Sequence, residues 1–185
     1  YKQAMFLQIK LIQSEPYTQK QNYAENVIGK VKQKYRRRKA KLNIPNRIWD
    51  YGYVWEAEVI SRTVTPTFKR TGIEKITGDT LDISEWLDFS FYDLVWFWDT
   101  PGDDDNPKLG RFLGVAHRIR SNLCYWVLKA NGQILARSTV QHVTKEDLQL
   151  LETKQKIEEF DKALRDRLND ANFVLPMKEG LHHQH

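Results

Sequence analysis

Residues 123–140, LCYWVLKANGQILARSTV, hold two strand-like runs on either side of an Asn-Gly pair, and they decide the fold class of this 185-residue chain. Asn131 and Gly132 favour a tight hairpin because both residue types accept a positive φ. Two further apolar and aromatic runs, 91–98 and 111–117, precede this hairpin, and polar turn residues separate the runs. Short strands at this regular spacing predict a small, strongly bent antiparallel sheet or barrel.

Helical patterns precede the predicted sheet. Residues 22–41 carry one apolar stripe at spacings of four, three and four, formed by Ala24, Ile28, Val31 and Tyr35. Pro45 is placed to begin a second helix, roughly 47–63, whose candidates for burial are Ile48, Trp49, Trp55, Val59 and Ile60. An irregular segment is expected from there to about residue 84.

A third helix is expected after the sheet, from about residue 144 to about residue 170. Thr144 and Asp147 at its start resemble a capping box, in which each side chain bonds a backbone amide of the other residue. The apolar stripe of this helix is narrow and consists of Leu148, Leu151, Phe160, Leu164 and Leu168. Helices before and after an antiparallel sheet make α+β the predicted fold class.

The formal charge of +5 at pH 7 conceals a strong asymmetry along the chain. From residue 20 to residue 47, ten Lys and Arg stand against the single acid Glu25. From residue 74 to residue 105, ten Asp and Glu stand against the single base Lys75. The basic surface is therefore local, and it suits a polyanionic partner.

Cysteine usage and hydropathy indicate the compartment. Cys124 is the single cysteine, which excludes an intrachain disulfide and a cysteine-rich zinc site and indicates a reducing environment. The chain has no 18-residue apolar run and no signal peptide, so we expect a soluble, intracellular protein without a membrane partner. The apolar residues 5–14 predict a short strand. Since strand-like residues are already under way after Tyr1, we expect a piece of a longer product.

A series of motifs between about residues 14 and 143 resembles those of one known family. Pro16-Tyr17-Thr18 followed by Gln21-Asn22-Tyr23-Ala24-Glu25-Asn26 resembles the PYTPQQNGVAER segment of copia-type retrotransposon integrases, which are DDE polynucleotidyl transferases. The other resemblances, in chain order, are Ile44-Pro45 with Trp49 to "LP…W", Thr65-Pro66-Thr67 to "RTPT", residues 77–84 to "GKKPDVSHL", residues 108–115 to "RSKKCIFLGY" and residues 125–140 to "GYRLWDPETGKIIVSRDVVF".

The resemblance implies three parts. Residues 1–75 would be the C-terminal part of an RNase H-like integrase core, residues 76–143 a small β-barrel of the Src-homology-3 type, and residues 144–185 a helical linker or tail. The parent would join DNA by metal-dependent strand transfer with Mg²⁺ or Mn²⁺. Its implied partners are DNA, as retroelement ends and target, and other integrase protomers, in the nucleus or a cytoplasmic particle.

Glu25 is the candidate catalytic and metal-binding residue, because it matches the family's third acidic residue. In the family this Glu and two Asp hold two divalent ions that activate a water or a 3′-hydroxyl. Those two Asp lie upstream in the family, and residues 1–24 contain no Asp, so the resemblance implies a fragment that is inactive alone. The alternative for Glu25 is an acid in the first helical turn, stabilised by the helix dipole.

The candidate nucleic-acid contacts are Asn22, Lys32, Arg36, Arg37 and Arg38. Lys32 and Arg36 fall within about 20° of the acidic candidate on a helical wheel, so they share its face. Contacts from such cations would be to phosphate, indifferent to base sequence and sensitive to salt. The alternatives are a solvated helix face or a nuclear-localisation patch.

Two further functional hypotheses come from other classes. The first is a non-catalytic module that binds nucleic acid through its basic helix and a protein or chromatin partner through an SH3-like barrel. The second is a decayed or domesticated fragment with only a scaffolding role.

Other conspicuous residues are interpreted as structural. Aromatic residues at 92–98 could stack on bases, but the neighbouring acids Asp88, Asp93 and Asp99 favour core packing. Residues 103–105, three consecutive Asp, lack the spacing of a calcium loop and indicate a solvated turn. Cys124 is expected in the core, and His182, His183 and His185 are expected to hold metal only adventitiously.

Overall fold

The computed structural model describes residues 23–64, 66, 69–80, 82–98, 107–117 and 123–169. The expected strand at 5–14, Asn22, the acidic turn at 103–105 and the histidines after residue 181 lie outside these residues. The elements are α2 (Tyr23–Leu42), η2 (Asn46–Ile48), α3 (Trp49–Arg62), α4 (Gly72–Thr77), α5 (Ser84–Leu87), β1 (Leu94–Phe97), β2 (Lys108–Val115), β3 (Tyr125–Leu128), β4 (Ile134–Arg137), β5 (Val140–His142), η3 (Asp147–Gln149) and α6 (Leu151–Asn169). The predicted α+β class is confirmed.

One antiparallel sheet of five strands, in the order β4-β3-β2-β1-β5, forms the centre of the described structure. Its order leaves β4 and β5 at the two edges, so the sheet is open. The predicted β3–β4 hairpin is confirmed: the Asn131 side chain accepts a bond from the Gln133 amide at 3.0 Å, and Gly132 has a φ of 81°. In β2 the pairing register shifts between Phe112 and Gly114, and such a bulge increases the local twist of a sheet.

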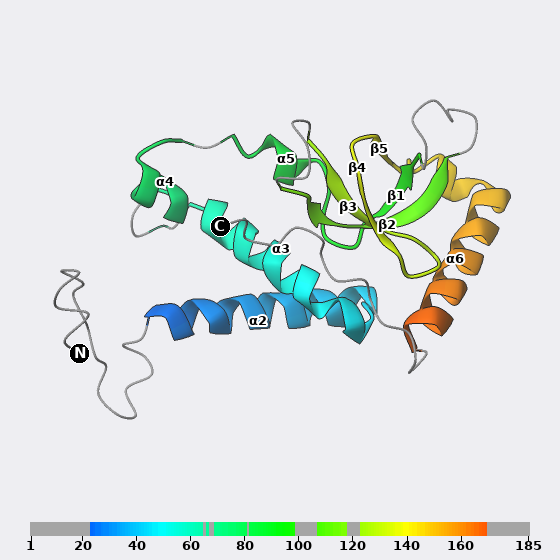
Figure 1. The fold of residues 1–185 in the computed structure, drawn as a ribbon, viewed down its shortest axis with the longest axis horizontal. Coiled ribbons are helices and arrows are strands. Elements are labelled where there is room, and N and C mark those ends of the chain that lie inside the picture. The colour runs from blue at the N-terminus through cyan, green and yellow to red at the C-terminus, as the bar shows by residue number, and fades with distance from the viewer. Residues whose placement is uncertain are drawn as a thin grey trace, which may run out of the picture.

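The core joins the sheet to two helices. Phe97, Phe112 and Val127 have no exposed area, and burial of such a side chain contributes roughly 1.5–3 kcal/mol. Trp55 of α3 packs edge-on against Phe112, with 5.4 Å between ring centroids. Leu164 of α6 is 1% exposed in the same core cluster, and the sheet lies between α3 and α6 in Figure 1.

The apolar cluster crosses the boundary expected at residues 75 and 76. Tyr35, Ile48 and Trp55 before it belong to one cluster with Phe91 and Phe112 after it. The helix hairpin α2–α3 is therefore packed onto the sheet.

Burial departs from the sequence prediction at several positions. Trp49 is 54% exposed, although it was expected in the core of the second helix. Leu148 and Leu151, expected in the last apolar stripe, are 42% and 71% exposed, whereas Phe160, Leu164 and Leu168 of that stripe are buried as expected.

Three element predictions also need correction. The Thr144 hydroxyl accepts the Asp147 amide as a capping box requires, but the cap precedes the short η3, and α6 begins only at Leu151. Within the segment expected to be irregular, Thr71 and Glu74 form a capping box that starts α4. The run expected as one strand at 133–140 divides into β4 and the start of β5, which pair at opposite edges of the sheet.

Candidate nucleic-acid interface

Helix α2 is the most basic described element, and half of it projects from the fold. Val31 and Tyr35 are buried, and Tyr35 packs against α3, whereas Ile28 is 51% exposed and Tyr23 is 78% exposed. Figure 1 shows why: α3 overlaps the C-terminal half of α2 and then diverges from it toward α4. The N-terminal half of α2 therefore presents most of its circumference to solvent.

The exposed cations on α2 form an extended charged surface. Lys32, Arg36 and Arg37 are exposed, as the sequence predicted for phosphate contacts. Lys30, Lys34 and Lys41 are also exposed, and the one acid of the helix is Glu25 in its first turn. A helix with this charge distribution attracts a polyanion along its length.

Arg38 differs from the exposed cations of α2 because it pairs with a buried carboxylate of α3. Its Nε donates to Glu56 Oε1 of α3 at 2.7 Å, and the side chains of Arg38 and Glu56 are 29% and 3% exposed. A carboxylate this deeply buried needs a paired cation. The geometry therefore assigns Arg38 to the contact between α2 and α3, and it leaves Lys32, Arg36 and Arg37 as the predicted cations that face solvent.

Glu25 lies where the sequence places it, in the first turn of α2, and it is exposed. No group of three His, Cys, Asp or Glu that could hold a metal ion occurs among the described residues. One exposed carboxylate does not provide the donor set of a two-ion centre. Glu25 therefore lies at the predicted helical position, and the described residues do not form with it a group that could hold Mg²⁺ or Mn²⁺.

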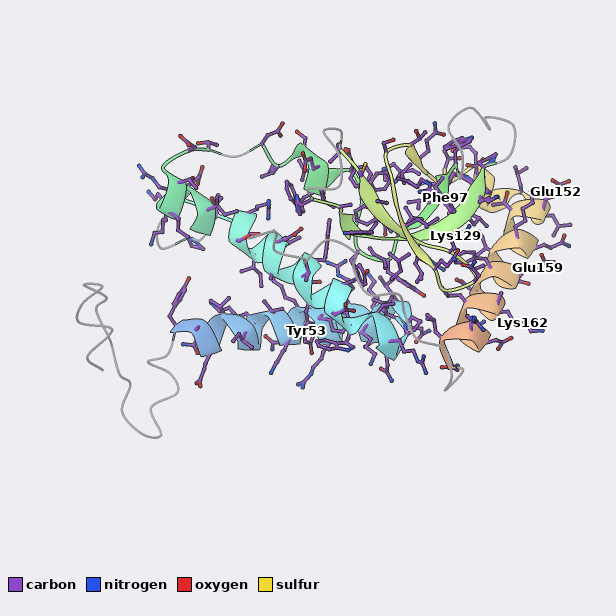
Figure 2. All side chains as sticks on the ribbon, viewed as in Figure 1. Tyr53, Phe97, Lys129, Glu152, Glu159 and Lys162 are labelled. Atoms are coloured by element: carbon purple, nitrogen blue, oxygen red, sulfur yellow. The ribbon has the colours of Figure 1, made fainter. Side chains whose placement is uncertain are left out.

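An aromatic series that sequence reasoning missed lies beside α2. The Trp49 and Tyr53 rings of α3 meet edge to face at 5.2 Å, and Tyr53 meets the buried Tyr35 of α2 in the same way at 5.0 Å. Figure 2 labels Tyr53 where α3 crosses α2. The signal in the sequence was the spacing of four between Trp49 and Tyr53, which puts both rings on one face of a helix.

A polar cluster fixes the far end of α3 to the sheet. Glu58 accepts a bond from Trp86 Nε1 at 2.9 Å and lies 3.2 Å from Nε2 of His117. The Arg62 guanidinium lies over the Trp86 ring at 3.5 Å, and burial is the main cause that lowers the Arg62 pKa. These contacts hold α5 and the end of β2 against α3.

The acidic segment lies on another side of α3 from the basic helix, as Figure 1 shows for α4, α5 and α2. Glu74 caps α4, and its bond from the Thr71 amide lowers the pKa of its carboxyl. Exposed acids continue along this segment at Asp79, Asp82 and Asp88. A polyanion is therefore attracted to the α2 side and repelled from the α4–α5 side.

Comparison of the chain with protein-family models, with curated proteins and with solved structures gave no significant match. Among the described helices, none combines the length and the apolar composition needed to cross a bilayer.

Proposed function

We propose that this chain binds nucleic-acid backbone through helix α2 and is the C-terminal part of a copia-type retrotransposon integrase. The observation that carries the binding is the solvent-facing cluster of Lys32, Arg36 and Arg37 on a helix that projects from the fold. Contacts from such cations release counterions from the phosphates, so the affinity depends on salt and hardly on base sequence.

The assignment to an integrase is supported by the ordered motifs and by the place of Glu25. The motif that resembles the family's third acidic segment runs into α2, with its Glu in the first turn. The barrel part of the proposal is supported by the sheet, since β1 pairs with both β2 and β5 and the bulge in β2 bends the sheet. In a Src-homology-3-like barrel, this bending would continue until the sheet closes on itself.

The binding test is a salt titration of duplex DNA affinity. Lys32→Glu with Arg36→Glu should weaken binding and reduce the slope of log affinity against log salt by roughly 1.8, about 0.9 per lost phosphate contact. The matched control is Lys154→Glu with Lys156→Glu, which changes the net charge equally on exposed residues of α6. Equal effects of the two double variants would refute a local interface on α2.

The catalytic part of the proposal concerns the intact parent. A protein extended upstream by two suitably placed Asp residues should perform metal-dependent strand transfer and lose it on Glu25→Gln. Gln keeps the size of the side chain and removes the charge that a divalent ion requires. Full activity of that variant would remove Glu25 from the active centre.

The competing proposal is a non-catalytic module that binds nucleic acid or chromatin. It is favoured by the shared core of the α2–α3 hairpin and the sheet, which makes the hairpin part of one unit with the strands. An upstream reading frame without the two Asp residues would decide for this module and against the enzyme.

A further inference from the structure

We propose that the ligand of α2 is single-stranded nucleic acid, with one unpaired base stacked on the indole ring of Trp49. The inference rests on the proposed binding function of α2 and adds the strandedness of the ligand. Its site consists of Trp49 and a row of three cations on α2. The row contains Lys32, Arg36 and Lys39, and we call it the α2 stripe.

Trp49 is exposed and yet held in place. Its side chain is 54% exposed, and the Tyr53 ring supports it edge-on at an interplanar angle of 74°. Tyr53 is supported in turn by Tyr35, which is only 3% exposed. An aromatic ring fixed in this way loses little conformational entropy when a ligand stacks on it.

The α2 stripe runs beside the face of α2 that contacts α3, because its three cations lie about 40–100° around the helix from Tyr35. Lys32, Arg36 and Lys39 follow one another at spacings of four and three residues, which places them in one row on a helix. Lys39 Nζ donates to Asn46 Oδ1, three residues before Trp49. This bond places the C-terminal end of the stripe about one helical turn from Trp49.

A row of cations beside an aromatic face suits a single strand. Phosphates of the strand would follow Lys32 and Arg36, while a splayed base would lie on Trp49, and such stacking is tolerant of base identity. A duplex buries its base faces, so it would use the cations alone. Asp50 follows Trp49 in sequence but projects about 100° away around the helix.

The test compares the full chain with Trp49→Ala on two probes, a single-stranded oligo-dT and a blunt duplex. We expect about a tenfold loss of affinity for the single strand, little change for the duplex and an unchanged salt slope. Trp49→Phe should retain most single-strand affinity because it keeps an aromatic face. Val54→Ala is the matched control, since Val54 is 46% exposed on α3 and lies about 140° from Trp49 around the helix.

Ultraviolet crosslinking to a halogenated oligo-dU strand, followed by peptide mapping, gives an independent result. We expect the crosslink on the peptide that contains Trp49. Equal single-strand affinities of Trp49→Ala and Val54→Ala, or a crosslink elsewhere, would overturn the inference. So would a Trp49→Ala variant that changes only the sedimentation of the protein, because Trp49 would then face a second copy of the chain.

The two proposals fail in different ways. If Trp49→Ala leaves the affinity for the single strand unchanged while the salt slope still depends on Lys32 and Arg36, only the stacking on Trp49 is refuted. A salt slope unaffected by Lys32→Glu with Arg36→Glu would refute the binding function of α2 itself.

Discussion

Gly52 of α3 lies directly against the phenol ring of Tyr35 of α2. A Cβ atom at Gly52 would lie 2.5 Å from Cδ2 of that ring and closer still to Cε2. Glycine in the middle of a helix weakens it, and this close approach is the physical reason for the residue here. It lets the two helices cross near Tyr35, and it therefore positions the basic surface of α2.

Replacing Gly52 by Ala should destabilise the protein by roughly 1–3 kcal/mol, because the Tyr35 ring has to move within a packed core. Gly29→Ala is the matched substitution on α2, where a Cβ meets nothing within 4 Å. There we expect stabilisation by up to about 1 kcal/mol from helix propensity. Urea denaturation measures both, and a tolerated Gly52→Ala would contradict the close crossing of the helices.

Adjacent arginines of α2 should respond differently to truncation. Arg38→Ala leaves the buried Glu56 carboxylate without its cation, and we expect a loss of about 3 kcal/mol in the free energy of unfolding. Arg37→Ala removes an exposed cation, so stability should change by less than about 0.5 kcal/mol while DNA affinity falls. A stability loss of equal size in both variants would contradict the structural role of Arg38.

The position of α2 in the sequence could be predicted from its residue pattern, but the extent of its burial could not. The spacing of the apolar residues placed the helix within one residue of its observed ends, and Val31 and Tyr35 are buried as a stripe requires. Ala24 and Ile28 belong to the same stripe and are exposed, because α3 covers only one half of the helix. The crossing point depends on Gly52, a tertiary feature that no local pattern contains.

Errors at Trp49 and Leu151 have a common cause in the rotational position of the first residue of a helix. Trp49 opens α3 and Leu151 opens α6, and at 100° per residue they lie about 120° from the buried Trp55 and about 180° from the buried Phe160. An apolar residue at this rotational position does not belong to the buried stripe, although its hydrophobicity suggested that it did. The helical position of Glu25 did not depend on assigning a residue to a stripe.

The contact between α6 and the sheet should depend on the ion pair of Arg111 with Asp161. Nη2 of Arg111 donates to both Asp161 carboxylate oxygens at 2.7 Å, Nη1 donates to the Tyr92 carbonyl at 3.3 Å, and the guanidinium lies over the Tyr92 ring at 4.8 Å. The single nitrogen of lysine cannot make these contacts together, so Arg111→Lys should lose about 1.5–3 kcal/mol and accelerate amide exchange along α6. Asp166→Asn changes an exposed residue of the same helix and should leave amide exchange unchanged. Equal amide exchange in both variants would contradict the role of Arg111 in holding α6 against the sheet.

The Tyr35 hydroxyl is buried and has no hydrogen-bond partner among the described residues, whereas the Tyr125 hydroxyl donates to Asp88 at 3.3 Å. Tyr35→Phe should therefore stabilise the protein by about 1 kcal/mol at neutral pH, and Tyr125→Phe should destabilise it by about the same amount. Thermal melts of both variants measure the difference. The same sign for both would show that the Tyr35 hydroxyl has a partner in solution.

The dependence of stability on alkaline pH gives a second test of Tyr35 and Tyr125. Burial is the main cause that raises the pKa of Tyr35 and of Tyr125 from 10.0 to about 12. Because the folded state holds these protons more tightly than the unfolded state, the stability they contribute is complete below pH 10 and is lost as pH rises toward 12. Tyr35→Phe should make this alkaline loss smaller, and an unchanged pH dependence of melting would show that Tyr35 titrates normally in the folded protein.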